Sequence, residues 1–347
     1  MNKLQYDISE VEPYINWLYF YHAWGLSGKP QTEKQQMRRE AEQMLHSWEG
    51  KFHTHGLVAL FEAYSEEDDI VLRVPVFEQS SASGQSSVSE QSSVSEQSSA
   101  SEQSSASEKI SASEQSSAFE HSVRSEKLFR LPLLRQQHPS APGAPNLCLA
   151  DFIRPKGKGG DKVSHEEKEE ACQAKATSFD EIGGKLGVFC ATVDQEIVEE
   201  NKQDEYQGMM AQLLCDRLAE ATAERLHEQV RKQIWGYAPD EQLTPEQLHR
   251  EEYQGIRPAI GYPSLPDTSF NFLIDQLLDM SQVGIRLTET GMMTPHSSVS
   301  GLMFAHPKAR YFELGKIGED QLQDYAHRRG IPVVLMKRFL QSSLLKK

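Results

Sequence analysis

The sequence predicts an α+β fold in which helices flank an antiparallel sheet. Two observations support this class. Short strand-like segments follow one another across turn signals, and the helical segments stand in separate blocks instead of alternating with single strands. A length of 347 residues allows one large domain or two small ones.

Helices are predicted where apolar residues recur at three- and four-residue spacing. The longest, Gly208–Trp235, carries a rough apolar stripe along one side. Thr244, Pro245 and Gln247 have the spacing of a capping box with proline at the first helical position, which predicts a short helix there. Gly330 is a common helix stop signal. The other predicted helices are Ser9–Trp24, Pro30–Trp48, Phe270–Met280 and Glu319–Arg329.

Strands are predicted for short runs rich in apolar and β-branched residues. Two of these runs, Val299–Ala305 and Arg310–Ile317, are separated by the turn His306–Ala309, so we expect a hairpin. The other predicted strands are Asp69–Val76, Leu128–Leu134 and Ile285–Thr290.

A serine-rich repeat occupies Gln79–Glu126. It consists of eight six-residue units, and seven of them end in glutamate. Such a segment buries too little apolar area to offset its ordering entropy, so we expect a disordered insert. A six-residue period also occurs in β-helices, but one Ala or Val in most units supplies few inward apolar residues. We expect the insert to be a long loop between the paired strands Asp69–Val76 and Leu128–Leu134.

The charge balance excludes some classes of function. The chain has 36 basic and 51 acidic residues, a net charge of −15, and no basic run. Phosphate contacts need clustered Lys and Arg, so we expect no nucleic-acid partner. The polar loop Lys156–Ser178 contains KGKGGDK, which lacks the spacing of a phosphate-binding loop.

The termini and the cysteines indicate a location. The N-terminal residues MNKLQYDISEVEPY are too polar for a signal peptide, and no apolar run approaches the roughly 20 residues that span a bilayer. The four cysteines lie far apart and form no CxxC pair, so neither a zinc ribbon nor a redox pair is indicated. We therefore expect a cytoplasmic protein with no membrane partner.

No standard catalytic motif is present. His46, His53 and His55 lie close together in sequence, but no nearby cysteine or spaced carboxylate completes a metal site, so none is predicted. The long predicted helix has polar residues away from its apolar stripe, a pattern typical of a solvated face. These are Asp216, Glu220, Glu224 and His227.

The segment Gly255–Asp267, GIRPAIGYPSLPD, predicts a rigid loop because its three prolines fix φ and its two glycines tolerate positive φ. Arg257 in such a loop is a fixed fork of donors suited to a carboxylate or phosphate. Gly261 would let a ligand approach the backbone, and Tyr262 offers a flat apolar face with a hydroxyl. The alternative is a turn held by ordinary arginine–carboxylate contacts.

Several segments carry a family resemblance. RPxxGYP at Arg257–Pro263, SVSG at Ser298–Gly301 and HPxxxYF at His306–Phe312 resemble the C-terminal activation domain of cobalamin-dependent methionine synthase. Pro13–Lys29 and Asn146–Lys156 are similar to earlier parts of that domain. The resemblance covers nearly the whole chain outside the serine repeat and the polar loop. It implies a single bent domain over residues 1–347, built on a twisted antiparallel sheet.

The resemblance also implies a ligand, S-adenosylmethionine, and a reaction, the reductive remethylation of cobalamin oxidised to the cob(II) state. Arg257 would pair with the ligand carboxylate, and backbone groups of Ala259 and Gly261 would contact its polar edges. Tyr262 would lie between the sulfonium and the corrin, and Glu220 near the reaction centre. The remaining implied ligand contacts are Asn16, Tyr311 and Phe312.

Two residues depart from the family pattern. Asn16 stands where the family usually has an aspartate, which can pair with the ligand ammonium group. Asparagine keeps an acceptor oxygen but loses the charge, so we expect binding weaker by about 1 kcal/mol. Phe312 lacks a hydroxyl that relatives can show there.

The chain has no cysteine cluster and no DxHxxG, the family motif that supplies the lower cobalt ligand. The resemblance therefore implies an accessory part of a methyltransferase, acting in trans on a cobalamin-binding methionine synthase core with an electron from a flavodoxin-type donor. Two alternatives stay open. The chain could reactivate another corrinoid methyltransferase, or it could be a non-catalytic module that binds S-adenosylmethionine or docks onto a partner.

Overall fold

The computed structural model of the protein describes residues 1–76, 125–157 and 183–345. The predicted disordered insert lies outside the described residues except for its last two positions, and so does nearly all of the predicted polar loop. The expectations for these two segments therefore stay predictions.

The chain divides into a main unit, Met1–Arg73 with Leu128–Lys347, and a small unit, Val74–Lys127. In the small unit the described residues are only the ends of two strands. The main unit carries the fold and the site described below.

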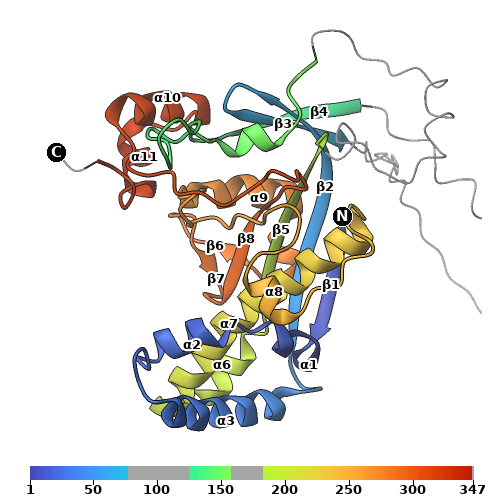
Figure 1. The fold of residues 1–347 in the computed structure, drawn as a ribbon, viewed down its shortest axis with the longest axis vertical. Helices are drawn as coiled ribbons and strands as arrows, with labels where there is room; N and C mark the ends of the chain where they lie inside the picture. The colour runs from blue at the N-terminus through green and yellow to red at the C-terminus, as the bar shows by residue number, and fades with distance from the viewer. Residues whose placement is uncertain (77–124, 158–182, 346–347) are drawn as a thin grey trace, which may run out of the picture. The chain divides into compact units, whose positions relative to one another are not determined.

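An antiparallel sheet forms the framework of the main unit (Figure 1). Its strand order is β4–β3–β2–β5–β8, and β1 also pairs with β2. The registers of β1–β2, β2–β3, β2–β5 and β5–β8 are all antiparallel, which confirms the predicted fold class. The strands are β1 Asn2–Asp7, β2 His53–Glu66, β3 Asp69–Val76, β4 Ser125–Pro132, β5 Lys185–Val193 and β8 Ser298–Met303, with a separate ribbon of β6 Arg286–Leu287 and β7 Met293–Thr294.

β2 is long enough, at 14 residues, to pair with three strands. β1 pairs with its first part, from His53 to Val58, and β3 pairs with its last part, from Glu62 to Glu66. β5 takes the opposite edge. β1, β2 and β5 were not predicted from the sequence. β5, KLGVFCATV, is buried on both faces and therefore lacks the alternation that identifies a half-exposed strand.

Helices pack on the sheet and against one another. Figure 1 shows α2, α3 and α6 gathered around α7, and α10 beside α11. The helices are α1 Ile8–Val11, α2 Trp17–Ala23, α3 Gln31–Trp48, α6 Glu196–Asn201, α7 Glu205–Gln229, α8 Pro245–His249, α9 Asn271–Leu278, α10 Glu319–Arg329 and α11 Val333–Phe339. Short 3₁₀ turns cover Glu12–Tyr14, Leu149–Phe152, Thr268–Phe270 and Met280–Val283.

α7 joins the two parts of the core. Its C-terminal half packs Ala223 and Leu226 onto the sheet, beside Val230 of the following turn, while its N-terminal half packs into a core shared with α1 and α3. Gly56 in β2 permits the close approach, because a Cβ there would lie 3.2 Å from Leu226 Cδ2. The helix continues beyond Gln229 as a π-helical turn, Val230–Ile234.

The loop Gly255–Asp267 runs along β8 on the edge that β5 leaves free. The Ile256 and Ile260 amides donate to Phe304 O and Ser300 O at 3.0 and 2.9 Å. This pairing makes the predicted hairpin wrong, because Arg310–Ile317 cannot occupy an edge that the loop already fills. The turn is present, with Ala309 N donating to His306 O at 2.9 Å, but the residues after it form no strand.

The remaining predictions concern helix boundaries, which depend on local capping and proline signals. The predicted helix Ser9–Trp24 is interrupted, because Pro13 belongs to a 3₁₀ turn and Asn16 caps a new helix, α2. The capping box at Thr244 is confirmed, since its side chain and that of Gln247 each bond the other residue's amide. The stop at Gly330 is confirmed by its φ of +65°.

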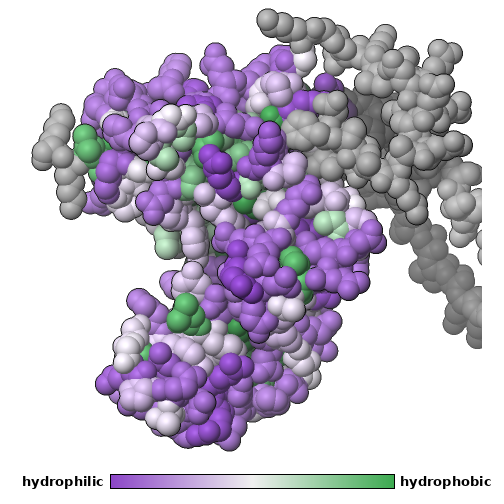
Figure 2. Space-filling view, in the orientation of Figure 1, coloured by the Kyte–Doolittle hydropathy of each residue, from purple (hydrophilic) through white to green (hydrophobic). Residues whose placement is uncertain are grey.

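The face drawn in Figure 2 is mostly hydrophilic, with small separate apolar areas. This agrees with the acidic composition of the chain. In the described ranges, every helix is too short or too polar to cross a lipid bilayer.

Candidate functional site

A cavity of about 590 Å³ opens between α7 and the loop Gly255–Asp267. This volume falls within the usual range of small-molecule sites, about 300–1,000 Å³. Apart from Gly261, every site residue predicted from sequence lines it. These are Asn16, Glu220, Arg257, Ala259, Tyr262, Tyr311 and Phe312.

Two glycines let the loop lie close to β8. Gly255 has a φ of +87°, and a Cβ there would lie 2.2 Å from Phe304 O. A Cβ on Gly301 would lie 2.2 Å from Pro258 O. The Tyr311 hydroxyl accepts a hydrogen bond from the Arg257 amide at 2.9 Å, which ties the loop to the segment after β8. The three sequence motifs RPxxGYP, SVSG and HPxxxYF thus meet at one place.

Arg257 and Glu224 form what we call the floor pair of the cavity. The Arg257 Nη2 atom donates to Glu224 Oε2 at 3.1 Å, and each side chain is only 11% exposed. Arg257 Nε is buried without a hydrogen-bond partner in the described part of the chain. Burial, the largest single effect, lowers the pKa of the Arg257 guanidinium, but Glu224 and the other acidic groups nearby together outweigh it, so the net pKa is raised. A fixed cation therefore faces the cavity.

Behind the floor pair lies a second buried arginine, Arg231, in the π-helical turn. Its Nε and Nη2 donate to Glu241 at 2.9 and 2.7 Å, and its Nη1 lies 3.9 Å from Glu224 Oε1. Glu241, Arg231, Glu224 and Arg257 thus form a row of alternating charges, which we call the ion chain. π-helical turns often occur at functional sites.

Two ring side chains flank this row. Arg231 lies over the Tyr253 ring at 4.2 Å from its centroid, and His227 meets the same ring edge-on at 5.0 Å. His227 is fully buried. Burial, followed by the charges of Arg231 and Arg257, lowers the pKa of His227 well below its ordinary value, so the imidazole is neutral near pH 7.

Tyr262 and Glu220 form what we call the rim pair. The Tyr262 hydroxyl donates to Glu220 Oε1 at 2.5 Å, and Tyr262 is 50% exposed. Partial burial and the charge of Glu220 raise the pKa of the Tyr262 phenol, so it remains a donor at neutral pH. Tyr19 and Leu18 on α2 are exposed as well, and Tyr19 lines the cavity. The cavity therefore has exposed apolar surface near the Glu220 carboxylate.

Asn16 lines the cavity, but its side chain already has a structural task. Its Oδ1 accepts the Leu18 amide at 3.1 Å and so caps α2. The acceptor oxygen that was expected to meet a ligand ammonium group is therefore engaged with the backbone.

Three other predicted contacts are placed as follows. Phe312 is 8% exposed, Ala259 is 6% exposed, and both line the cavity. Gly261 has a φ of +89°, which favours glycine, and its amide donates to Leu265 O at 2.8 Å. That amide holds the turn of the loop.

The predicted solvated face of the long helix is wrong for Glu224 and His227. Both are buried because the loop and the π-helical turn cover that side of α7. A signal was available, since Glu220 and Glu224 are four residues apart and so share a helix face. The cavity also has wall residues that the analysis did not single out, among them Glu251, whose φ is +58°, and Tyr253.

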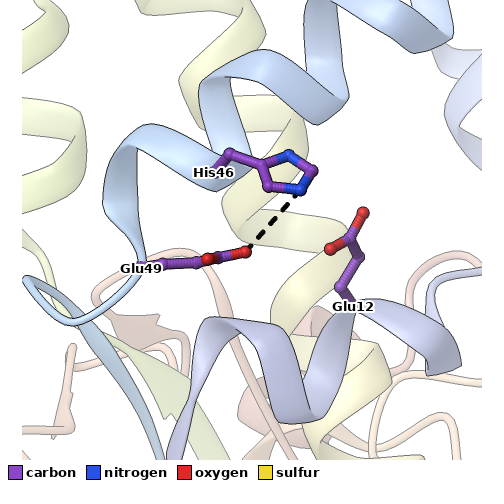
Figure 3. A group of neighbouring side chains, drawn as sticks. All are labelled: Glu12, His46 and Glu49. Atoms are coloured by element: carbon purple, nitrogen blue, oxygen red, sulfur yellow. Dashed lines mark ion pairs between the residues drawn. The ribbon is translucent and has the colours of Figure 1, made fainter.

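The three histidines considered for a metal do not meet at one point. His55 and His53 contact Asp194, with His55 Nε2 2.7 Å from Asp194 Oδ1. His46 instead approaches Glu49 at 3.9 Å near Glu12 (Figure 3), and the candidate ligand atoms of these three residues lie within 4.8 Å of one another. His46 and Glu49 are exposed, and exposed acidic groups of this kind are common without an ion. We therefore assign no metal ion to this group.

Fold and cavity together define a class of protein. It is an α+β module with a cavity of small-molecule size between a long helix and a Gly/Pro loop laid along a sheet edge. The family described as vitamin B12 dependent methionine synthase, activation domain, matches residues 7–115 and 106–330. The chain belongs to this family.

A solved structure supports the same assignment. It is a crystal structure of the MetH reactivation domain bound to AdoHcy, with 30% sequence identity to this chain and a TM-score of 0.69. The alignment covers 100% of this chain and 91% of that one. The predicted family resemblance is therefore confirmed.

Proposed function

We propose that the chain binds S-adenosylmethionine in the cavity and supports reductive remethylation of cob(II)alamin on a separate cobalamin-dependent methionine synthase. The observation that carries the proposal is the buried Arg257 guanidinium at the floor of the cavity, with its Nε atom unpartnered among the described residues. The relative in complex with AdoHcy supports the ligand class. AdoHcy is what remains of S-adenosylmethionine after its methyl group has left.

The residues around the cavity suit the parts of this ligand. Arg257 is the partner for the carboxylate, since a buried guanidinium makes strong charge-assisted bonds. Tyr311 and Phe312 supply apolar ring surface for the adenosyl part. Glu220 and the Tyr262 ring at the rim can attract the positive sulfonium.

In the reaction we propose, bound S-adenosylmethionine supplies the methyl group, and a flavodoxin-type donor supplies the electron that reduces cob(II)alamin. The residues of this chain hold the ligand by its carboxylate and keep the methyl group at the exposed rim. A rim pair open to solvent allows a cobalamin-carrying partner to reach it. We also propose a cytoplasmic location, which the buried free thiols of Cys148, Cys190 and Cys215 support.

A second candidate, a non-catalytic binding or docking module, is favoured by one observation. The Asn16 side-chain oxygen already caps α2 and carries no full charge, so its contact to a ligand ammonium group would be weaker than that of an aspartate. Binding without turnover is the outcome that distinguishes this candidate.

Calorimetric titration of S-adenosylmethionine into the purified protein tests the proposal. We expect saturable binding that Arg257→Ala abolishes and that Arg310→Ala, an exposed arginine outside the cavity, leaves unchanged. A protein that binds should then increase methylcobalamin formation on a methionine synthase core lacking this domain. No binding at millimolar ligand contradicts the proposal, and binding without remethylation favours the second candidate.

A further inference from the structure

The ion chain suggests how the cavity recognises its ligand. Arg257 is the end of a row of four charges that alternate in sign from Glu241 through Arg231 and Glu224. All four side chains are at most 11% exposed. Charges in such a place interact strongly because little water screens them.

The charges of Glu220 and Glu251 also act on Arg257, but Glu224 is the acidic group that hydrogen-bonds it in the described part of the chain. The Arg257 side chain contacts Glu224 through Nη2 and lies 5.8 Å from the Phe189 ring centroid, and its Nε is unpartnered among the described residues. Of these groups, only Glu224 offers both a charge and a hydrogen bond. Removing that carboxylate would free the guanidinium to turn and would leave it facing the like charge of Arg231.

Glu224 is itself held from behind. Its Oε1 faces Arg231 Nη1 at 3.9 Å, and neither atom has a hydrogen-bond partner in the described ranges. Glu241 fixes Arg231 with a two-pronged contact. The ion chain is therefore fixed at the Glu241 end, while Arg257 at its other end faces the cavity. A ligand bound next to Arg257 would continue the alternation of charges if it carried a negative charge.

We propose that Glu224 is a positioning residue that, supported by Arg231 and Glu241, presents Arg257 for the carboxylate of the ligand. This inference rests on the proposed function and deepens it. It assigns carboxylate recognition to a side chain that need not touch the ligand. The selectivity of the cavity for a carboxylate-bearing ligand then depends on Glu224 as well as on Arg257.

The test compares two ligands that differ only in the carboxylate, S-adenosylmethionine and its decarboxylated form, by calorimetry on the full chain. For Glu224→Gln we expect S-adenosylmethionine to bind at least tenfold more weakly and the decarboxylated form to bind as it does to the wild type. Glu241→Gln should show the same selective loss of affinity, but a smaller one, because Glu241 acts on Arg257 only through Arg231 and Glu224. Glu224→Asp should recover part of the loss because it restores the charge.

The control is Glu205→Gln, which removes an exposed charge from the first turn of α7. Glu205 lies 19 residues before Glu224, about 28 Å along the helix axis. It should change neither affinity. If Glu224→Gln does not fold, Glu241→Gln and Glu224→Asp carry the test, since each keeps a carboxylate at position 224.

Three results would overturn the inference. Unchanged affinity for S-adenosylmethionine in Glu224→Gln and Glu241→Gln would show that Arg257 needs no support. Equal loss of both ligands would show a structural role without carboxylate selectivity. If the wild type binds neither ligand, the proposed function fails and this inference fails with it.

Discussion

The floor pair and the rim pair are built from the same parts but differ in burial. Each joins a glutamate of α7 to a side chain of the loop Gly255–Asp267, and the two glutamates are one helical turn apart. At the floor, Arg257 and Glu224 are 11% exposed, whereas Tyr262 at the rim is 50% exposed. One helix and one loop thus supply both a buried pair and an accessible pair to the same cavity.

The largest effect on stability and binding is expected at Gly255, where the loop that carries Arg257 packs closely against β8. Gly255→Ala would put a Cβ 2.2 Å from Phe304 O at a φ of +87°. We expect a loss of about 3 kcal/mol in unfolding free energy and no measurable S-adenosylmethionine binding, because the loop must leave β8. Urea denaturation and calorimetry measure the two effects.

The matched control is Gly261→Ala, near the rim. Its φ of +89° is similar, but an added Cβ meets nothing within 4 Å. Only the conformational cost of about 1–2 kcal/mol should remain. Equal losses in the two variants would contradict the view that the floor depends on close seating of the loop.

The next effect concerns the pH dependence of stability, because the buried His227 beside the floor pair resists protonation. The pKa of His227 is lowered below its ordinary 6.5, so as pH falls below 6.5 the unfolded chain binds a proton that the folded chain does not. Stability is therefore full above pH 6.5 and declines below it by up to about 1.4 kcal/mol per pH unit. Denaturation curves between pH 5 and 7 measure this slope.

His227→Gln should make that slope shallower. His296→Gln, at a side chain that is 77% exposed, is the control and should leave it as in the wild type. A slope that does not change in His227→Gln would mean that other groups set the acid sensitivity of the fold.

At the rim, removal of a hydroxyl should affect turnover more than stability. In Tyr262→Phe the hydrogen bond to Glu220 is lost, but the site is partly solvated, so the unfolding free energy should change by less than about 1 kcal/mol. We expect remethylation to slow about tenfold, equivalent to about 1.4 kcal/mol in the barrier. A rate assay with a cobalamin-carrying partner would reveal the difference. A stability loss as large as that of Gly255→Ala would erase the distinction between floor and rim.

The smallest effect should come from Asn16→Asp. Aspartate also caps helices, so α2 should be retained, while the added charge can attract the ligand ammonium group. We expect affinity to rise by about 1 kcal/mol, roughly fivefold. Asn16→Ala serves as the control, because it removes the cap and should cost about 1 kcal/mol of stability. If calorimetry shows no gain in affinity for Asn16→Asp, residue 16 does not contact the ligand ammonium group.

Features of the site that depend on local chemistry could be predicted from the sequence. The rigidity of the loop and the capping box at Thr244 follow from the residue types present. The cavity brings together Arg257, Glu220 and Tyr311, which the family motifs had singled out. Their joint placement on one cavity could not be derived from spacing alone.

What escaped prediction depends on tertiary contact. Glu224 and His227 resemble any solvated helix face until a loop more than 25 residues later covers them. β5 carries no alternation because helices cover the faces of the sheet. The predicted strand Arg310–Ile317 failed because an irregular loop, rather than a strand, took the free edge of β8.

That occupied edge has a consequence for solubility. Unpaired strand edges invite other chains to add to a sheet, and here the Ile256–Ile260 segment satisfies β8 while Pro258, having no N–H, offers an incoming strand one donor fewer. The segment that lines the cavity thus also protects this sheet edge against aggregation. Variants that unseat it would then first be noticed in the insoluble fraction of a preparation, before any weakening of affinity could be measured.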